Sequence, residues 1–600
     1  MHDPHSAANP AVAKAVHLAL DLEVDFDRRS LAGAATWTLE MSQGAGTVIF
    51  DTRGLEITSV DILTARGKSR ARFRLGADAL ILGAPLHVEV PVGARAVVIK
   101  YKTNPHAAGL QWLEPSQTAD RKLPFLYSQA QAILARTFVP CQDSPGIRIT
   151  YEATIRTPSG FEAVMSAIRD DDVKVLADGR REFRFHQPHP IPSYLIAIAV
   201  GDLAQRVLGP RTSVWAEPSV VDKAAYEFAD LERMIDAIEG LYGPYAWNRY
   251  DVLVLPPSFP FGGMENPMMT FATPTLLAGD RSLVNVIVHE LAHSWSGNLV
   301  TNETWNDFWL NEGFTVYLER RAVEALYGTS VARRQWTNAR RALRGTCAAM
   351  SATPADTHLR LALAGRDPDD GMTEIAYEKG ALLLRRLEVE FGREVFDQFL
   401  KSWFATHAFG PVGTELFVSW VRDRLCGGKK DRFAALRLER WIDGPGIPDD
   451  APPEDLGVLE HIEAQVTAFN RAGTLPTPDG WSTDEWLRFL DLIDPDVTRA
   501  QLAALDAKFE LTARTNAEVV ARWLEVGVKH GLKSVYPRLE SFLIEVGRRK
   551  YLKPLYGALA SVSVEGLDLA RQIYARARPG YHAISRATLD KLLGSEGGGD

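Results

Sequence analysis

The spacing of hydrophobic residues separates a β-rich first third of the chain from a mainly helical remainder. Between Val16 and about Asp202, apolar residues often occupy every second position, as in Leu18–Phe26 and again in Ile147–Ile155. This period of two is typical of strands with one buried face, and turn-forming residues separate the shorter runs. We therefore predict an N-terminal β-sheet domain over residues 1–203.

After about Glu217 the apolar period changes to about 3.6, which indicates amphipathic helices. Helical patterns dominate a mixed region at 204–442 and return from residue 456 to residue 600. Residues 443–455, "DGPGIPDDAPPED", contain four prolines and two glycines and are predicted to form a linker. The last region is predicted to be a solenoid-like stack of helical hairpins, although no fixed repeat period is present.

Composition and charge narrow the class of partner. A chain of 600 residues with 46% hydrophobic and 24% charged residues is too long for one core, so we expect several globular domains. The formal charge of -9 and the absence of basic runs argue against nucleic acid and membrane surfaces. No run of eighteen apolar residues predicts a membrane span. We expect a small-molecule or peptide partner and favour a monomer, although the sequence leaves the oligomeric state open.

The cysteines favour a reducing compartment. Cys141, Cys347 and Cys426 are few, odd in number and far apart, which suits neither a disulfide framework nor a thiolate zinc cluster. The first residues, "MHDPHSAANPAVAKAV", lack the apolar core of a signal peptide. We therefore predict a cytoplasmic protein.

The stretch "NVIVHELAHSWSGNLVTNETWNDFWLNEG" carries the first candidate chemistry. His289 and His293 are four residues apart, so a helix would direct both imidazoles from one face towards a single ion. A buried pair of histidines on an apolar helix needs polar partners, which a metal ion supplies. Spacing alone therefore favours a zinc site over chance. Glu290, adjacent to a ligand, could serve as the general base for metal-assisted hydrolysis of an amide.

The same stretch predicts two neighbouring helices. Asp280 or Ser282 could cap the start of the first, and Gly297 suits its end. Catalytic zinc takes three protein ligands, so Glu312, in the second helix, is the candidate for the third. On spacing alone a surface salt bridge explains Glu312 equally well. Glu319 could orient a ligating imidazole, but a solvated helix charge is an equal alternative.

The flanking motifs carry a family resemblance. The spacing HExxH-x18-E, preceded by "GGMEN" at Gly262–Asn266 and followed by "AYEKG" at Ala376–Gly380, resembles the M1 (gluzincin) family of zinc aminopeptidases. Segments such as "LYSQAQAI", "VPCQDSP" and "GRRKYLKPLY" are similar to its leukotriene A4 hydrolase branch, in order over nearly the whole chain. The resemblance implies a saddle-like β domain, a thermolysin-like catalytic domain (204–442) and a curved C-terminal helical domain (456–600), with the active site where all three meet.

The resemblance also implies roles in catalysis. His289, His293 and Glu312 match the family's ligands for one zinc ion per chain, and Glu290 matches its general base. Tyr377 of "AYEKG" matches the tyrosine that donates to the developing oxyanion. From the sequence alone, Tyr377 would be interpreted as a core aromatic residue at a helix start.

For substrate binding, the resemblance implies short peptides with a free amino terminus. Glu265, in the loop with Gly262, Gly263 and Met264, matches the glutamate that binds the α-amino group. A carboxylate at a fixed distance from the metal favours cleavage one residue from that amine. Gln131 matches a glutamine near the same end of the substrate.

Other positions concern the rest of the substrate. Asp369 matches an aspartate involved in substrate selection, and Arg548 and Lys550 match a basic pair that binds a substrate carboxylate in the leukotriene hydrolase branch. Without the resemblance, the basic pair would be a solvated charge run. Two positions differ, because Met372 and Phe261 stand where the animal enzymes have tyrosines. Methionine cannot donate a hydrogen bond or react with an epoxide as a phenol can.

We therefore predict a zinc-dependent aminopeptidase. Two alternatives stay open: an additional epoxide hydrolase activity on fatty-acid epoxides, which Met372 disfavours, and a non-catalytic, zinc-bound scaffold that binds peptides. A closed structural site would have four protein ligands and no use for Glu290, so the sequence argues against the scaffold.

Overall fold

The N-terminal part is a set of β-sheets whose buried faces follow the alternating apolar pattern. In the computed structural model, which describes residues 3–41 and 46–594, strand β1 (Ala13–Asp25) buries Leu18, Leu20 and Leu22. It pairs on one side with β2 (Ser30–Met41), antiparallel, and on the other with β11 (Arg148–Thr157), parallel. The segment at the start of the chain is thus an interior strand of the sheet.

The large sheet follows the order β13-β15-β11-β1-β2-β8-β4-β5, with β14 paired to β15. Its other strands are β4 (Glu56–Thr64), β5 (Gly67–Arg70), β8 (Ala94–Lys102), β13 (Ile168–Arg169), β14 (Lys174–Val175) and β15 (Arg181–Pro192). Two smaller sheets have the orders β3-β7-β6 and β12-β16-β10-β9. Their strands are β3 (Gly46–Phe50), β6 (Phe73–Leu75), β7 (Leu86–Val90), β9 (Leu110–Leu113), β10 (Phe125–Ser128), β12 (Glu162–Met165) and β16 (Ile198–Gly201).

The middle part combines a third kind of sheet with helices. The sheet order is β17-β18-β19-β21-β20, formed by β17 (Ala204–Val207), β18 (Thr212–Ala216), β19 (Tyr250–Val254), β20 (Gly263–Met264) and β21 (Met269–Ala272). Its helices are α1 (Val221–Glu227), α2 (Leu231–Tyr242), α3 (Asn285–Ala292), α4 (Trp309–Tyr327), α5 (Thr329–Ala349), α6 (Gly380–Phe391), α7 (Arg393–His407), α8 (Thr414–Trp420), α9 (Lys430–Ala435) and α10 (Leu438–Ile442). A short parallel pair joins β22 (Val300–Asn302) to β23 (Gly410–Val412).

The segment 443–455 forms turns and extended chain with no helix or strand. It lies against the middle part, because the Asp450 carboxylate accepts hydrogen bonds from Arg386 and Trp441. Glu454 pairs with Arg344 at 2.6 Å. The predicted linker is therefore attached along its length to the surface that it crosses.

All the regular elements described in the C-terminal part are helices. Its helices are α11 (Glu460–Ala472), α12 (Thr483–Asp491), α13 (Arg499–Phe509), α14 (Ala517–Lys529), α15 (Tyr536–Glu545), α16 (Arg549–Val562), α17 (Val564–Ala577) and α18 (Ala583–Leu593). Their buried residues form a core of their own, whereas the first two parts share one continuous core. None of the helices in the described ranges has the length and apolar composition needed to span a bilayer.

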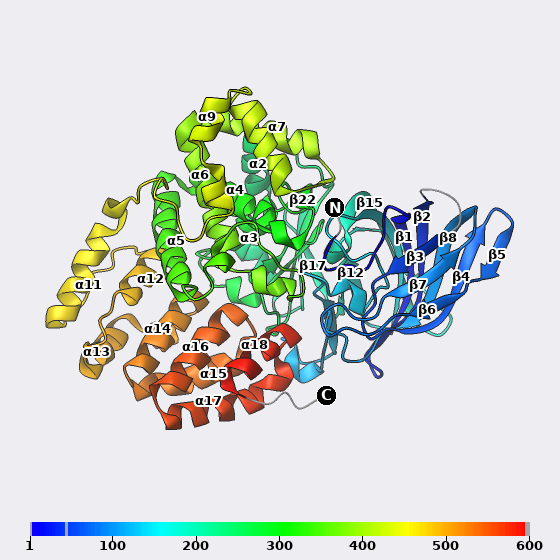
Figure 1. The fold of residues 1–600 in the computed structure, drawn as a ribbon. Helices are drawn as coiled ribbons and strands as arrows, with labels where there is room; N and C mark the ends of the chain where they lie inside the picture. Colours follow the sequence, from blue (N-terminus) through cyan, green and yellow to red (C-terminus); the bar gives the residue numbers. More distant parts are fainter. Residues whose placement is uncertain (1–2, 42–45, 595–600) are drawn as a thin grey trace.

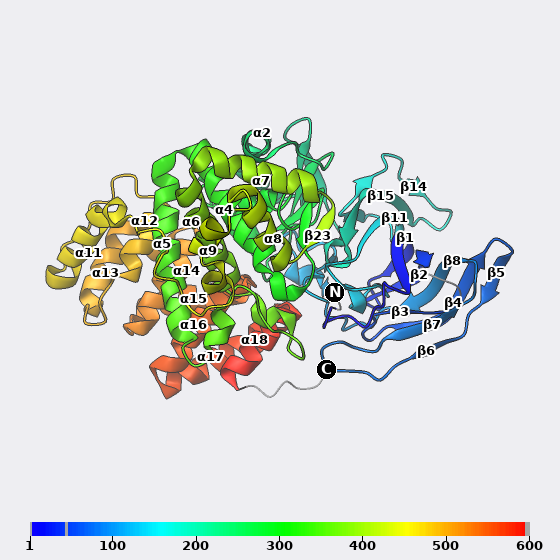
Figure 2. The ribbon, with the colours of Figure 1, turned by 45° about the horizontal axis from the view of Figure 1, so that its top comes forward.

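The N-terminal and C-terminal parts both pack against the middle part. In Figure 1 the blue and cyan strands lie to the right of the green middle part, and the orange and red helices lie below it. Figure 2 shows the same arrangement after rotation. The predicted architecture of a β domain, a mixed domain and a helical domain is confirmed. The sheet changes between β16 and β17, close to the predicted boundary at residue 203.

Candidate active site

Helix α3, which carries His289, begins later than the sequence suggested. The residue before α3 is Val284, which offers no side-chain cap, so the expected caps Asp280 and Ser282 are wrong. The reason is local: the Asp280 carboxylate accepts the backbone N–H of Ser282 and closes a turn ahead of the helix. The helix itself ends at Ala292, with His293 still in a helical conformation.

Helices α3 and α4 lie antiparallel. The His289 Nδ1 atom is 3.0 Å from the Glu319 carboxylate, and His293 Nδ1 is 3.1 Å from the Thr315 hydroxyl. As the residue number rises by four in α3, it falls by four in α4. This arrangement brings the face of α4 that carries Glu312 against both imidazoles.

The three predicted metal ligands converge. The Nε2 atoms of His289 and His293 are 3.2 Å apart, and Glu312 Oε2 lies 3.3 and 3.6 Å from them. Ligand atoms of a tetrahedral zinc ion, each about 2.0–2.1 Å from the metal, lie about 3.4 Å from one another. Glu312 Oε2 is buried and has no well-directed hydrogen bond from any described residue. The donor set and the geometry therefore fit zinc.

The opposite edges of the imidazoles are fixed by other groups. His289 Nδ1 faces the Glu319 carboxylate, while His293 Nδ1 lies 2.9 Å from the Ser296 carbonyl oxygen. A hydrogen on each Nδ1 leaves the Nε2 lone pair for a metal. Burial lowers the pKa of His293 to about 4, so this ring is neutral at pH 7. Both rings are thus held in the tautomer that a metal ion requires.

Glu290 lies on the neighbouring edge of α3, in contact with the "GGMEN" segment. A Cβ atom at Gly263 would overlap the Glu290 carboxylate, so glycine is what allows β20 to pass this close. Burial raises the pKa of Glu290 well above its ordinary value. One oxygen of Glu290, one of Glu265 and one nitrogen of His293 also fall within 4.8 Å of one another. Because that set has only one imidazole, the His289 set fits zinc better.

Glu265 is a buried carboxylate at the junction of the first two parts. Gln131, from the N-terminal part, donates its amide to Glu265 Oε1 across 3.4 Å. The Glu265 backbone carbonyl accepts a hydrogen bond of 2.7 Å from Asn298. Burial raises the pKa of Glu265. Asn298 was not predicted, since no spacing rule links a residue in the turn after α3 to the "GGMEN" loop.

Tyr377 lies in a single π-helical turn, Ile375–Lys379, immediately before α6. Its ring stacks on the His289 ring, with centroids 6.3 Å apart, and packs edge-on against Phe308. Burial and the nearby carboxylate of Glu312 raise the pKa of Tyr377 well above its ordinary value. The phenol therefore keeps its proton and can donate it.

Two glycines set the distance between Glu312 and Tyr377. A Cβ atom added at Gly313 would lie 2.7 Å from the Gly380 Cα, and one added at Gly380 would lie 2.8 Å from the Gly313 Cα. Helices α4 and α6 therefore approach backbone to backbone at this point. The glycines in "NEG" and "EKG" have a packing role that brings Glu312, the predicted third metal ligand, close to Tyr377.

The basic pair is divided between two environments. Arg548 is buried, donates to the Tyr551 hydroxyl at 2.8 Å, and would contact a Cβ atom added at Gly262. The Lys550 side chain is 60% exposed and forms a 2.7 Å ion pair with Glu518. Although burial opposes the shift, Lys550 and Arg548 lower the pKa of Glu518 to about 2. Only Arg548 touches the "GGMEN" loop, and sequence spacing gave no sign of Glu518.

Asp369 lies in a short 3₁₀ helix, Pro368–Gly371. Burial and the Asp367 carboxylate raise the pKa of Asp369 to about 7, against the effect of Arg549 and the Ala132 backbone N–H. Asp369 therefore lies close to both outer parts. Met372 and Phe261 are half-buried and pack against the main core. These two positions therefore present a thioether and a phenyl group, neither of which can donate a hydrogen bond as a phenol can.

Comparison with known proteins covers all three parts. Residues 14–195 match the Peptidase M1 N-terminal domain, 226–431 the Peptidase family M1 domain, and 481–593 the C-terminal domain of leukotriene A4 hydrolase. The leukotriene A-4 hydrolase of Xenopus laevis is 38% identical over 93% of this chain and 93% of its own length. The chain belongs to peptidase family M1. It is accordingly a zinc metallo-hydrolase with one catalytic zinc ion.

Other M1 relatives also match nearly the whole chain. Leucine aminopeptidase 2 of Yarrowia lipolytica is 36% identical, with 98% of this chain and 93% of that protein covered. The structure of yeast LTA4 hydrolase in complex with Bestatin superposes with a TM-score of 0.91 at 32% identity, covering 99% of this chain and 97% of that one. These relatives agree with the predicted zinc aminopeptidase.

Proposed function

We propose that this zinc aminopeptidase removes single residues from the amino terminus of short peptides, with Glu265 selecting the free α-amino group. The observation that carries the proposal is the buried Glu265 carboxylate, which lies within 4.8 Å of a His293 nitrogen and is backed by Gln131 from another domain. The ammonium group of a substrate would provide a positively charged partner for this buried carboxylate. A peptide amine held there has its first carbonyl next to the metal site.

His289, His293 and Glu312 would hold the zinc ion, since their ligand atoms converge and no described residue makes a well-directed hydrogen bond to Glu312 Oε2. When bound, zinc supplies a Lewis acid that makes water more acidic and polarises a carbonyl group. Glu290 accepts a proton from the attacking water and transfers it to the leaving amine. Tyr377 donates a hydrogen bond to the oxygen of the tetrahedral intermediate.

The far end of the substrate faces the C-terminal part. We assign the substrate carboxylate to Arg548, which lies against Gly262 of the "GGMEN" loop. Lys550 is exposed and paired with Glu518, so its role is to attract anions towards the cleft rather than to contact them throughout binding. Asp369 adds a selecting group on the wall between these two ends.

The experiment that tests the function is a panel of aminoacyl arylamides and tripeptides, assayed before and after removal of metal. We expect cleavage of unblocked substrates, its loss with a chelator, and its return when zinc is added. N-acetylated versions of the same peptides should resist cleavage, because an amide cannot pair with Glu265. Efficient cleavage of blocked peptides would instead assign the protein as an endopeptidase.

Epoxide hydrolysis is a second candidate, favoured by the match of residues 481–593 to the leukotriene A4 hydrolase C-terminal domain and by the buried Arg548. Met372 argues against it, since a thioether cannot act as a phenol does. Incubation with a fatty-acid epoxide distinguishes the two possibilities. Formation of a diol that requires the loaded metal site would support this activity, and its absence would leave the peptidase alone.

We propose that the protein acts in the cytoplasm as a monomer. The side chains of Cys141, Cys347 and Cys426 are all free thiols, which suits a reducing compartment. Fractionation of cells and analytical ultracentrifugation test the two statements separately.

A further inference from the structure

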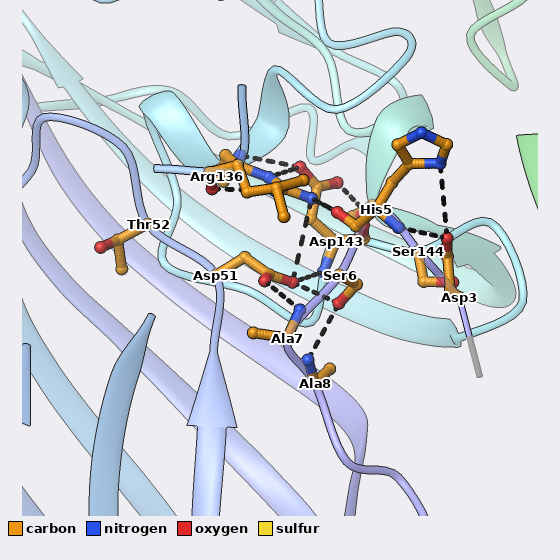
Figure 3. Close-up of polar contacts among 12 residues, drawn as sticks. Asp3, His5, Ser6, Ala7, Ala8, Asp51, Thr52, Arg136, Asp143 and Ser144 are labelled. Atoms are coloured by element: carbon orange, nitrogen blue, oxygen red, sulfur yellow. Dashed lines mark hydrogen bonds and ion pairs between the residues drawn. The ribbon is translucent and has the colours of Figure 1, made fainter. Parts of the chain in front are cut away.

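The first described residues join two parts of the molecule. Residues 3–8, which we call the strap, lie between the N-terminal β domain and the loop 358–371 of the catalytic part. Figure 3 shows the polar contacts of the strap with the β domain. His5 is only 1% exposed, although it belongs to a stretch with no helix or strand. Most buried polar groups in proteins have hydrogen-bond partners. The partners of the strap residues therefore show which segments the strap connects.

The ring of His5 binds the catalytic part. Its Nε2 atom lies 3.1 Å from the Leu363 carbonyl oxygen and 3.2 Å from the Arg366 carbonyl oxygen. Two acceptors on one ring nitrogen require that this nitrogen carries the hydrogen. Arg366 precedes Asp369 by three residues, and the loop turns directly into the 3₁₀ helix that carries this aspartate. The ring therefore fixes the base of the Asp369 turn.

The main chain of His5 binds the N-terminal part. Its carbonyl oxygen accepts a 2.7 Å hydrogen bond from Arg136, a fully buried residue whose Nε also donates to Asp143 at 2.9 Å. Arg136 lies in the 3₁₀ helix Ala135–Thr137, directly after the turn that carries Gln131 and Ala132. His5 thus contacts both the loop that leads to Asp369 and the 3₁₀ helix that follows Gln131.

The rest of the strap is anchored on the β domain. The Asp51 carboxylate accepts the Ser6 hydroxyl at 2.5 Å and the Ala7 backbone N–H at 2.8 Å. Asp3 accepts the Ser144 hydroxyl at 2.5 Å. Figure 3 shows these bonds on both sides of His5. Because the segment is tied at both ends, movement of the His5 ring is transmitted to the loop rather than absorbed by the strap.

The two supported segments meet beside Glu265. The Ala132 backbone N–H faces the Asp369 carboxylate, and the adjacent Gln131 reaches Glu265 at 3.4 Å. We propose that His5 is a positioning residue that fixes the Asp369 turn against the Gln131 turn and thereby sets how peptides longer than one residue are held. This inference rests on the proposed aminopeptidase function. A single aminoacyl group reaches only Glu265 and the metal site, so the strap affects longer substrates selectively.

Two substitutions of the same residue separate the hydrogen bond from the packing. His5→Gln keeps an N–H donor at the same number of bonds from Cα, whereas His5→Phe keeps a ring of similar size and removes the donor. His106→Phe, at an exposed histidine of the same domain, is the matched control. The substrates are the tripeptide Ala-Ala-Ala and alanine p-nitroanilide.

We expect His5→Phe to raise KM for the tripeptide at least fivefold, with kcat and the arylamide KM within twofold of the wild type. His5→Gln and His106→Phe should both resemble the wild type. Equal losses on the two substrates, or no change on either, would overturn the positioning role. If His5→Phe does not fold, Ser6→Ala loosens the strap at its Asp51 anchor and should produce the same selective change.

Hydrogen exchange of the metal-free protein tests the strap without catalysis. In His5→Phe, amides of residues 363–371 and 130–137 should exchange at least fivefold faster than in the wild type, and His5→Gln should protect them. Unchanged exchange overturns the strap even if the enzyme is active. A wild type that cleaves no peptide overturns the proposed function, while the exchange result still decides whether His5 holds the two turns.

Discussion

At the scale of single residues, the proposed role of Glu290 as general base can be tested by one substitution. Glu290→Gln preserves shape and leaves His289, His293 and Glu312 in place, so the variant should bind zinc as the wild type does. Loss of the proton-transfer group should lower kcat by about 10²–10⁴-fold. Metal analysis and steady-state kinetics on one preparation check both statements, and wild-type turnover in the variant would refute the role.

The Glu265 carboxylate should matter for the amine end of the substrate only. Glu265→Gln removes a charge-assisted contact worth about 2–3 kcal/mol, so kcat/KM for an unblocked tripeptide should fall roughly 30- to 150-fold. Glu394→Gln, at an exposed carboxylate on α7, is the control and should have no effect. A variant that still prefers free over N-acetylated peptides would show that the amine is held elsewhere.

The relative positions of site residues could be predicted from spacing only where one stretch of chain sets the distance. The four-residue spacing of His289 and His293 defines their geometry because His289 lies in α3 and His293, directly after its last residue, keeps the helical conformation. Glu312 needed the antiparallel packing of a second helix, which spacing alone left undecided. Asn298 and Glu518 contact site residues from segments that no spacing rule connects to them, so the structure was required to find them.

At the scale of elements, the contact between α4 and α6 is the most demanding. Gly313→Ala would place a methyl group against the Gly380 backbone, and relief requires the helices to separate. We expect a loss of about 1–3 kcal/mol in stability and weaker zinc binding, since Glu312, next to Gly313, moves relative to His289 and His293. Gly345→Ala, on α5 with no atom within 4 Å of the added Cβ, should be neutral or stabilising.

Thermal unfolding and zinc competition with a chelator measure the two effects of Gly313→Ala. A variant that is as stable as the wild type and binds zinc as tightly would mean that the contact between α4 and α6 accommodates the methyl group.

The periodic pattern predicted both α3 and α4 correctly, but it placed the start of α3 too early. Caps depend on one side-chain orientation, and the Asp280 carboxylate is used in a turn instead.

At the scale of the whole molecule, His582 lies where the three parts meet. Its side chain caps α18, and its ring stacks on Tyr127 with centroids 6.1 Å apart. The Tyr127 hydroxyl in turn contacts Ser258 of the catalytic part at 2.9 Å. Burial, with a smaller effect of Arg586, lowers the pKa of His582 to about 3. The interface is therefore built around a neutral imidazole.

Because the folded-state pKa of His582 is depressed, its contribution to stability is complete above about pH 6.5 and is lost progressively as the pH falls towards 3. At pH 5 the loss should be about 2 kcal/mol. His582→Asn can still cap α18 but does not titrate. The variant should be less stable at pH 7, and the difference should shrink by pH 5. Melting temperatures at both values measure it, and a constant difference would contradict the prediction.

The order of the three parts could be predicted, because the apolar period changes from two to about 3.6 after the first part and the Pro-rich segment 443–455 separates the other two. Their arrangement could not. The shared core of the first two parts, the attachment of Asp450 and Glu454 to the catalytic surface, and the Tyr127 contact all depend on side chains from distant segments. Such contacts leave no periodic trace in either segment.

The parallel pairing of β1 with β11 has a consequence for synthesis on the ribosome. His17 pairs with Thr150, which follows it by 133 residues. At about 5–20 residues per second, β1 waits roughly 7–27 s for this partner. During that interval the hairpin of β1 and β2 exposes its apolar face and its unpaired edge. Chaperone binding and aggregation therefore compete for the nascent N-terminal domain at this stage of synthesis.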